Sequence, residues 1–311
     1  MTRTASIDAG SNTFRILIAD VDHRTLRPLV RDMIITRMAQ GLGDGGRFHP
    51  EAWGRGRDAL RKFAAMMTAY RVEASVGVAT SAFRRAADGP AFVSAARDMG
   101  IKLDVISGTE EAELTLAGVR SVLSEEDNRA GLLVDVGGGS TELIAFHSDK
   151  VMWKLSLRLG AVGLWERFIT TDPPYPGQLV AMSQYIQDAL TGANSELDDA
   201  IRTMKGRVRL IGTAGTATTL AAMDLVMTNY DPAAIDNHLL TYDRLQSLYH
   251  RMASLPAQAR LALPGLYPGR EDIILSGAAV VLEVMTMFGC RDLRITDAGL
   301  LEGIILNRIA V

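Results

Sequence analysis

The sequence lacks features that several classes of protein require. It has one cysteine, Cys290, among 311 residues, which excludes an intrachain disulfide framework and a multi-cysteine metal site and fits a reducing compartment. Basic and acidic side chains nearly cancel, 33 against 36, so the net charge of -3 argues against a protein that binds nucleic acid through its overall charge. The uncharged stretch Leu210–Met223, like every other in the sequence, is shorter than the roughly 18 apolar residues of a membrane span. We therefore expect a cytoplasmic protein with neither nucleic acid nor a membrane as a partner.

Common nucleotide and metal motifs are also missing. The stretch Gly41–Gly46 satisfies the pattern G-x-G-x-x-G, but the next helix is predicted to begin only near Pro50. The strand–turn–helix context of a dinucleotide site is therefore absent. No Walker A lysine motif occurs, and the five histidines lack the spacing of metal ligands.

Helical and strand periodicities alternate along the chain, which indicates an α/β fold, and the length suits two domains of about 150 residues each. Three β-rich runs, Thr4–Asp8, Phe14–Val21 and Leu26–Arg37, predict an antiparallel meander. Two further runs, Val76–Ala79 and Leu103–Ile106, predict buried strands that are each followed by a helix. Apolar residues at intervals of three and four predict one face of a long helix. They are Trp53, Leu60, Phe63, Met67 and Tyr70.

The pattern restarts after a charged break at Glu125–Arg129, which we interpret as an exposed domain boundary. Gly131–Val136 is a predicted strand, and a glycine turn connects it to a second predicted strand, Thr141–Phe146. The two openings, Asp8–Thr13 and Asp135–Ser140, resemble each other and lie 127 residues apart. We interpret this similarity as an internal duplication of one supersecondary unit.

Both openings are aspartate-glycine turns of a kind that can bind phosphate. Glycine lets a phosphate group approach backbone N–H groups because no Cβ obstructs it. Asp8 and Asp135 would hold Mg2+, a hard ion that prefers oxygen ligands. The alternative is a pair of tight hairpin turns, for which Asp, Asn and Gly are common, but two matching copies favour phosphate binding. The predicted phosphate-binding residues are Gly10, Ser11, Asn12 and Thr13 in the first turn and Gly137, Gly138, Gly139, Ser140 and Thr141 in the second.

A third glycine turn follows the predicted strand Val208–Ile211 and opens a helix that continues to Met223. Backbone N–H groups at the start of a helix favour an anion, so Gly212, Thr213, Gly215 and Thr216 are further candidates for phosphate binding. The alternative is an ordinary strand-to-helix connection in which Thr213 or Thr216 is the N-cap.

An acidic helix start at Ser107–Glu113 supplies a candidate base. Ser107 and Glu110, three residues apart, match a capping box, which gives Glu110 a structural role. Glu111 has no such role, and if it faces a cleft between the two halves it could deprotonate a water molecule as a general base. The alternative is that Glu111 is another first-turn acid that interacts favourably with the helix dipole.

Together these motifs resemble those of the exopolyphosphatase/guanosine pentaphosphate phosphohydrolase (Ppx/GppA) family. That family belongs to the superfamily of actin, heat-shock chaperone ATPases and sugar kinases. The resemblance covers the whole chain, in its short form, and implies two RNase H-like domains that face each other across a cleft. The implied domains are 1–124 plus 296–311, with a returning C-terminal helix, and 125–295. The motifs are Ile7–Thr13, Ala79–Arg84, Ser107–Ala112, Asp135–Glu142, Gly212–Thr216 and Asp297–Gly303.

The resemblance also implies roles for individual residues. Glu111 matches the catalytic glutamate of the family, and Arg84 matches an arginine that contacts phosphate. Asp135 and Glu142 match acidic residues linked to Mg2+ and catalysis.

This chain departs from the family pattern at two arginines. Leu301 replaces the arginine of the family's Gly-Leu-Arg-Glu-Gly sequence, and Gly163 replaces one that often follows Gly-Ala-Val. The loss of two candidate phosphate ligands puts affinity for long polyphosphate in doubt, unless Arg158, Arg270 or Arg85 compensates.

The sequence therefore predicts an Mg2+-assisted phosphohydrolase. Its substrate would be inorganic polyphosphate, shortened from the end, or guanosine pentaphosphate, hydrolysed at its 5′-terminal phosphate; polyphosphate is slightly favoured because no residue pattern predicts guanine recognition. One alternative is an ATP-dependent kinase or ATPase of the same superfamily, although Arg84 and the Glu110–Glu111 pair argue against it. Another is a catalytically weak protein that binds guanosine tetra- or pentaphosphate. The oligomeric state stays open, a homodimer included.

Overall fold

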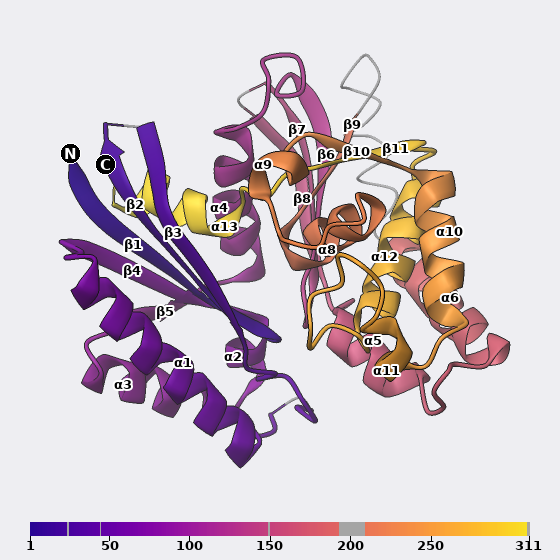
Figure 1. Ribbon diagram of the computed structural model, residues 1–311, viewed down its shortest axis with the longest axis horizontal. Helices are drawn as coiled ribbons and strands as arrows, with labels where there is room; N and C mark the ends of the chain where they lie inside the picture. The colour runs from indigo at the N-terminus through magenta and orange to yellow at the C-terminus, as the bar shows by residue number, and fades with distance from the viewer. Residues whose placement is uncertain (24, 44, 149, 193–208, 310–311) are drawn as a thin grey trace. The chain divides into compact units, whose positions relative to one another are not determined.

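The computed structural model describes residues 1–311 except 24, 44, 149, 193–208 and 310–311, and the chain divides into two compact units (Figure 1). Unit 1 comprises Met1–Ser121 and Gly299–Val311, and unit 2 comprises Val122–Ala298. Within the described residues, no helix combines the length and the apolar character that crossing a membrane requires.

Unit 1 contains a five-stranded sheet in the order β3-β2-β1-β4-β5. The strands β1, β2 and β3 form the predicted antiparallel meander, and β4 and β5 extend the sheet in parallel with β1. The elements of unit 1 are β1 (Thr2–Ala9), β2 (Thr13–Asp22), β3 (Thr25–Ile35), α1 (Pro50–Ala69), β4 (Ala74–Ala79), α2 (Ser81–Arg85), α3 (Gly89–Asp98), β5 (Leu103–Val105), α4 (Gly108–Arg120) and α13 (Leu300–Arg308).

The helix α1 forms as predicted and begins at Pro50, but its buried face differs from the expected one. Leu60 and Phe63 are buried, whereas Tyr70 is the C-cap and is 37% exposed. Small residues complete the buried stripe, because a Cβ at Gly56 would lie 2.9 Å from the ring of Phe92. Spacing of large apolar residues could not show that a glycine occupies the closest contact.

The two faces of the unit 1 sheet bury different side chains. One face contacts an aromatic cluster under α1 and α3, in which Phe14 and Phe92 pack edge to face with ring centroids 6.1 Å apart. On the other face, Leu17 and Ala19 of β2 pack against Leu301 of α13. Thus α13, the last described helix of the chain, belongs to the core of unit 1.

The helices α4 and α13 lie side by side at backbone contact (Figure 1). A Cβ at Gly303 would collide with the Leu114 carbonyl, and a Cβ at Gly118 would collide with the Gly299 carbonyl. Glycine on each helix therefore permits a separation that any other residue would prevent.

Unit 2 contains a six-stranded sheet in the order β10-β11-β9-β6-β7-β8. Its elements are β6 (Ala130–Val136), β7 (Thr141–His147), β8 (Lys150–Leu157), α5 (Ala161–Phe168), α6 (Pro176–Thr191), β9 (Arg209–Thr213), α8 (Ala214–Asp224), α9 (Pro232–Ile235), β10 (His238–Thr241), α10 (Tyr242–Ala253), α11 (Ala257–Arg260), α12 (Ile274–Met287) and β11 (Asp292–Ile295). The predicted strand before the third turn is present as β9; the first residue of its predicted range, 208, lies outside the described residues.

The strand orders confirm the predicted α/β fold and its internal duplication. The series β8-β7-β6-β9-β11 of unit 2 repeats the series β3-β2-β1-β4-β5 of unit 1. Directions repeat as well, with two antiparallel pairs followed by two parallel ones. The strand β10 is an addition that pairs antiparallel with β11 at the edge.

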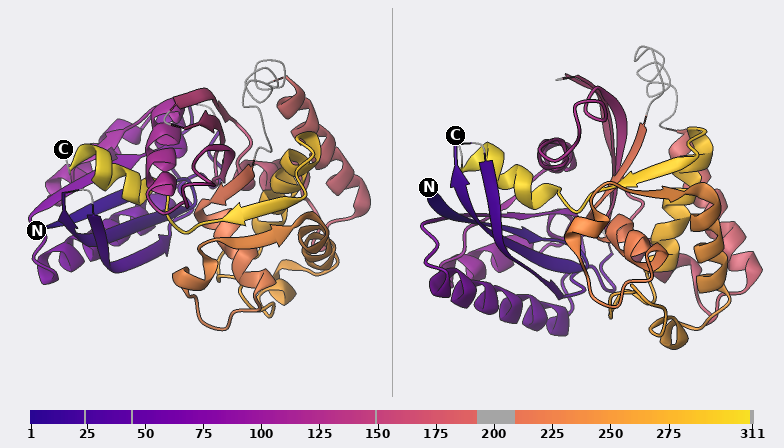
Figure 2. Two further views of the ribbon diagram at one scale, coloured as in Figure 1. Left: turned by 90° about the horizontal axis from the view of Figure 1, so that it is seen from above. Right: turned by 45° about the horizontal axis from the view of Figure 1, so that its top comes forward.

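The main core of unit 2 lies between its sheet and a layer of helices (Figures 1 and 2). Leu132, Val134 and Val136 alternate along β6 and face α5, α6, α8, α10 and α12. The intervening residues of β6, which include Asp135, point to the opposite face of the sheet. This alternation separates the predicted site residue from the apolar core.

The charged segment Glu125–Arg129 is not uniformly exposed, which corrects the prediction from composition. Asp127 is buried, accepts a hydrogen bond from Ser124 Oγ at 2.7 Å, and forms ion pairs with Arg209 and Arg294. Asp127 can be buried within a charged run because β9 and β11 supply arginine partners from distant parts of the sequence.

We expect Gly303→Ala to lower the free energy of unfolding by about 1–3 kcal/mol, because the added methyl group would force α4 and α13 apart. Urea denaturation measures the change. Gly163→Ala is the matched control, since a Cβ there meets no atom within 4 Å and alanine is better than glycine in a helix by roughly 0.5–1 kcal/mol. Destabilisation by both substitutions would contradict the close contact as the cause.

Candidate functional site

The first glycine turn follows β1 in unit 1. The Gly10 N–H donates to the Thr13 carbonyl at 3.0 Å, and a Cβ at Gly10 would lie 2.8 Å from that oxygen, so the turn requires glycine. The Asn12 carbonyl accepts hydrogen bonds from the next segment, 36–37. The Asn12 side chain is buried, and its Nδ2 has no hydrogen-bond partner among the described residues. A buried donor without a partner is energetically costly, so a ligand that accepts from Nδ2, such as a phosphoryl oxygen, would remove that cost.

Asp8, at the end of β1, is already neutralised by a cation. In the β1–β2 register it lies opposite Arg15, and its Oδ2 accepts from Arg15 Nε at 2.9 Å and Nη2 at 2.6 Å. Its Oδ1 is buried with no hydrogen-bond partner among the described residues. Asp8 therefore offers one oxygen, and the positive charge of Arg15 beside it disfavours a metal ion.

The second turn carries a different pair at the corresponding positions. Asp135 lies opposite Glu142 in the β6–β7 register, and each is 127 residues beyond its counterpart, Asp8 and Arg15 respectively. Both acids are buried, and Glu142 Oε1 accepts from Ser156 Oγ at 2.7 Å. The duplication therefore places two carboxylates across one pair of strands where unit 1 has a carboxylate and a guanidinium.

These two carboxylates suit Mg2+, which proteins commonly bind through one or two carboxylates while waters and substrate phosphates complete the shell. The described residues contain no group of three or more histidine, cysteine, aspartate or glutamate side chains that could hold a metal by themselves. A site built on Asp135 and Glu142 would therefore depend on the substrate for further oxygen ligands.

The loop of the second turn is fastened to the start of α5. The Gly137 and Gly138 carbonyls accept from the N–H groups of Ala161 and Val162 at 2.9 and 3.0 Å. A Cβ at Gly160 would collide with this loop. Among the described residues, none accepts a hydrogen bond from the N–H of Gly138 or Gly139. Adjacent N–H groups of this kind form an anion-binding concavity.

The predicted threonine ligands use their hydroxyl protons within the protein. Thr141 Oγ1 donates to the Leu159 carbonyl at 2.6 Å, Thr213 Oγ1 donates to Ala298 at 2.7 Å, and Thr216 Oγ1 donates to Val136 at 2.7 Å. Since a hydroxyl has a single proton, these side chains cannot also donate to phosphate in this arrangement. Thr213 occupies the N-cap position of α8, but its side chain makes no capping hydrogen bond.

Among the remaining predicted ligands, Ser11 and Ser140 are buried in their turns, and Thr13 begins β2. Gly212 lies in β9 and packs against Leu293, where a Cβ would lie 3.0 Å from a methyl carbon. That contact gives Gly212 a packing role.

The third turn lies directly under an arginine. A Cβ at Gly215 would collide with the guanidinium of Arg270, which comes from the segment between α11 and α12. Arg270 is 7% exposed. The first N–H groups of α8 and this guanidinium thus form an electropositive site within unit 2.

Arg84 and Glu111, predicted separately from two motifs, are in direct contact in unit 1. Arg84 Nη1 donates to Glu111 Oε2 at 2.9 Å and to the Ile106 carbonyl at 2.8 Å. Arg84 lies in the short helix α2, and Glu111 is in the first turn of α4 and is 8% exposed.

Glu110, the neighbour of Glu111, has a different partner from the one predicted. Ser107 Oγ accepts from the Glu110 N–H at 3.1 Å, which is one half of the predicted capping box. The Glu110 carboxylate, however, pairs with Arg308 of α13. Sequence alone could not show this pairing because the two residues are 198 positions apart.

Comparison with known proteins decides the family. The model of the Ppx/GppA phosphatase family matches residues 17–310. The chain belongs to the Ppx/GppA phosphatase family. Exopolyphosphatase 2 of Mycobacterium tuberculosis is 34% identical to this chain, and the match covers 99% of this chain and 98% of that protein.

Solved structures of Ppx/GppA proteins share the fold. An exopolyphosphatase from Cytophaga hutchinsonii has a TM-score of 0.88 at 27% identity, over 98% of this chain and 96% of that chain. The Aquifex aeolicus member of the Ppx/GppA family has a TM-score of 0.80 at 27% identity, over 99% and 97%. The resemblance stated from the motifs and the α/β fold class are thereby confirmed.

The two departures from the Ppx/GppA pattern lie in opposite environments. Leu301 is buried and packs against Leu17 and Ile305, so an arginine there would place a charge in an apolar cluster. Gly163 is exposed on α5, where a side chain would meet open space. Leu301 is therefore part of the core of unit 1, whereas Gly163 leaves a surface position without a side chain.

Proposed function

We propose that this protein is an exopolyphosphatase, which hydrolyses the terminal phosphoanhydride bond of inorganic polyphosphate with Glu111 as general base. A water oxygen would attack the terminal phosphorus while Glu111 accepts the water proton. The bond from phosphorus to the bridging oxygen would break, and its electron pair would go to that oxygen. The products are orthophosphate and a chain one phosphate shorter. Exopolyphosphatase 2 of Mycobacterium tuberculosis, similar over nearly the full length, supports this choice of substrate.

The arrangement of Arg84 is the observation that carries the proposal. Its Nη1 donates to Glu111, and neither Nε nor Nη2 has a hydrogen-bond partner among the described residues. Those two nitrogens form the fork with which arginine binds phosphate oxygens. One guanidinium can thus hold a phosphoryl group beside the carboxylate that activates water, which favours a near-attack geometry.

Each unit carries further groups that can bind an anion. The unpaired Asn12 Nδ2 and the N–H groups of Gly138 and Gly139 can each donate to phosphoryl oxygens. In unit 2, Arg270 lies over Gly215 and supplies a positive charge. It is one of the three arginines that the sequence offers as candidates to compensate for the two missing family arginines. Donors aimed at developing charge stabilise the transition state of phosphoryl transfer.

Asp135 and Glu142 would hold Mg2+. When bound, the ion would neutralise charge on the phosphoryl oxygens. Arg15 holds Asp8 in a fixed orientation, so Asp8 Oδ1 would act through a hydrogen bond to water or to a ligand. Guanosine pentaphosphate presents the same phosphoanhydride chemistry and is the second substrate that we propose to test.

Phosphate release by the purified protein tests the proposal, with long polyphosphate, guanosine pentaphosphate and ATP compared in the presence of Mg2+. We expect release from polyphosphate and little from ATP. Release from guanosine pentaphosphate alone would assign the other substrate of the family. Release from ATP alone would favour an ATPase or kinase, and binding of guanosine tetra- or pentaphosphate without any release would favour a sensor.

A further inference from the structure

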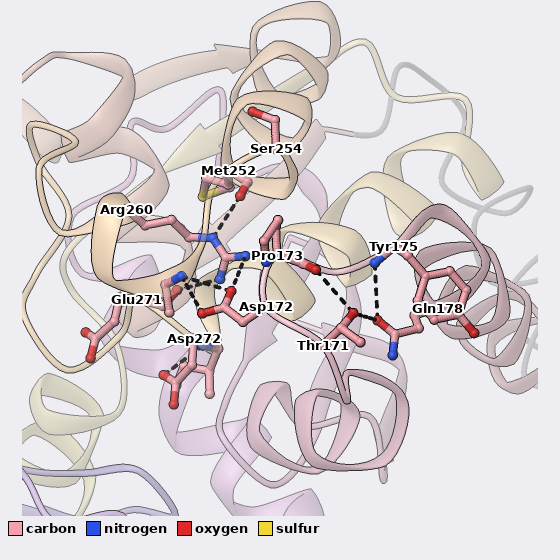
Figure 3. A network of polar contacts seen from close by, with 12 residues as sticks. Thr171, Asp172, Pro173, Tyr175, Gln178, Met252, Ser254, Arg260, Glu271 and Asp272 are labelled. Carbon is pink, nitrogen blue, oxygen red and sulfur yellow. Dashed lines mark hydrogen bonds and ion pairs between the residues drawn. The ribbon is translucent and has the colours of Figure 1, made fainter.

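Arg260 is a fully buried charge at the meeting point of three segments of unit 2. Its Nε donates to the Met252 carbonyl at 2.8 Å, and its Nη1 donates to the Glu271 carbonyl at 2.9 Å (Figure 3). Its Nη2 lies 3.7 Å from Asp172 Oδ1. Both oxygens of Asp172 also accept from the Ala257 N–H at 2.9 Å, which ties the start of α11 to the same point.

The segment that Arg260 holds is the one that carries Arg270. This segment, 261–273, connects α11 to α12, and Glu271, whose carbonyl accepts from Arg260, is the next residue after Arg270. At the middle of the segment, Gly265 has a φ of +82° and packs so closely on Ala222 of α8 that a Cβ would collide with its carbonyl. The segment is therefore fixed against α8 at its middle and by Arg260 near its end.

The buried charge of Arg260 is difficult to explain by a contribution to stability alone. Burial lowers the pKa of Arg260 through desolvation, and the charges of Asp172 and Asp272 oppose that effect. Nη2 has no hydrogen-bond partner among the described residues. Replacing a buried ion pair with apolar side chains is often neutral or stabilising, so stability alone gives little reason for arginine here.

We propose that Arg260 is a positioning residue for Arg270, and that it sets the affinity of the third turn for the phosphate groups of the substrate. By holding the Glu271 carbonyl, it fixes the backbone from which the Arg270 guanidinium extends over Gly215. The inference rests on the proposed function for its substrate, but it concerns binding and can be tested without turnover.

A double-mutant cycle tests the coupling. Calorimetry measures the binding of tripolyphosphate to four proteins: the wild type, Arg260→Met, Arg270→Met and the double variant. A chelator removes Mg2+, so that binding is measured without hydrolysis. Arg270→Met should weaken binding about 10-fold or more, as loss of charge-assisted hydrogen bonds does. Arg260→Met should reproduce most of that loss, and the double variant should bind no more weakly than Arg270→Met. Independent, multiplying effects would overturn the proposal, because residues that act through each other are non-additive.

Control variants separate positioning from folding. Arg167→Met removes another arginine of unit 2, one stacked on Tyr185 with its guanidinium carbon 4.2 Å from the ring centre, and should leave affinity unchanged. Arg260→Lys retains the charge but loses the fork that joins Glu271 and Met252, and it replaces Arg260→Met if that variant does not fold. Wild-type affinity in a folded Arg260 variant would overturn the proposal.

The outcome also separates this inference from the proposed function. Coupled loss of binding, with no phosphate release by the wild type, would support the role of Arg260 and refute the hydrolase. Phosphate release that neither arginine affects would refute the role of Arg260 and leave the hydrolase standing. No binding of tripolyphosphate by the wild type would overturn the inference.

Discussion

Glu111→Gln should lower the rate of phosphate release from polyphosphate by about 10²–10⁴-fold, the usual cost of losing a general base. Glutamine is nearly the same shape, and its amide oxygen can still accept from Arg84 Nη1, which now lies 2.9 Å from Glu111 Oε2. What it cannot do is take a proton from water. The loss should therefore fall on kcat, with affinity for tripolyphosphate largely retained.

Glu110→Gln is the control that the chain itself offers. Glu110 is the next residue in the same helix turn, but its carboxylate pairs with Arg308 of α13. We expect near-normal turnover and a small loss of stability, because the pair is partly exposed and such pairs contribute little, roughly 0–1 kcal/mol. Steady-state kinetics and urea denaturation of both variants would separate these effects. Normal activity of Glu111→Gln would remove Glu111 from the mechanism.

Arg84→Met would distinguish binding from base catalysis. If Arg84 holds a phosphoryl group through Nε and Nη2 while it orients Glu111 through Nη1, this variant should lose both affinity and kcat. A loss of kcat alone would mean that Arg84 serves only to orient the carboxylate. Kinetics over a range of substrate concentrations gives both quantities.

The sequence predicted the strands and turns well because their signals are local. Short continuous apolar runs mark β6 and its partner β7, and the glycines at positions 10 and 137 mark turns whose backbone hydrogen bonds a Cβ would disturb. The duplication was visible for the same reason, since two short turns 127 residues apart share their spacing. Fold class follows from such repeated local patterns.

The partners of side chains were harder to predict, because they depend on tertiary contacts. Thr213 and Thr216 were expected to donate to phosphate or to cap α8, yet both hydroxyls donate to carbonyls more than 79 positions away in the sequence. Arg15 had no motif of its own, and its pairing with Asp8 emerges only from the β1–β2 register. A turn motif can therefore locate an anion site without showing which of its side chains are already committed.

The second large effect that we expect concerns Mg2+, because Asp135 lies opposite a carboxylate whereas its counterpart Asp8 lies opposite an arginine. Asp135→Asn should raise the Mg2+ concentration needed for half-maximal phosphate release by about 10-fold or more, because charge is the main attraction between a carboxylate and this hard cation. Glu142→Gln should act in the same direction, since Glu142 lies directly opposite Asp135 across the strand pair. Calorimetry with Mg2+ on the unliganded variants gives a second measure that does not depend on activity.

Asp8→Asn is the matched control for that experiment, because Asp8 is the counterpart of Asp135 in unit 1. Its carboxylate already pairs with Arg15, so its removal should leave the Mg2+ dependence nearly unchanged. It should instead lower the free energy of unfolding by about 1–3 kcal/mol, since the hydrogen bonds from Arg15 would lose the negative charge of their acceptor. An equal rise in the Mg2+ requirement for both aspartate variants would contradict this prediction, because it would mean that Arg15 does not neutralise Asp8 in place of the cation.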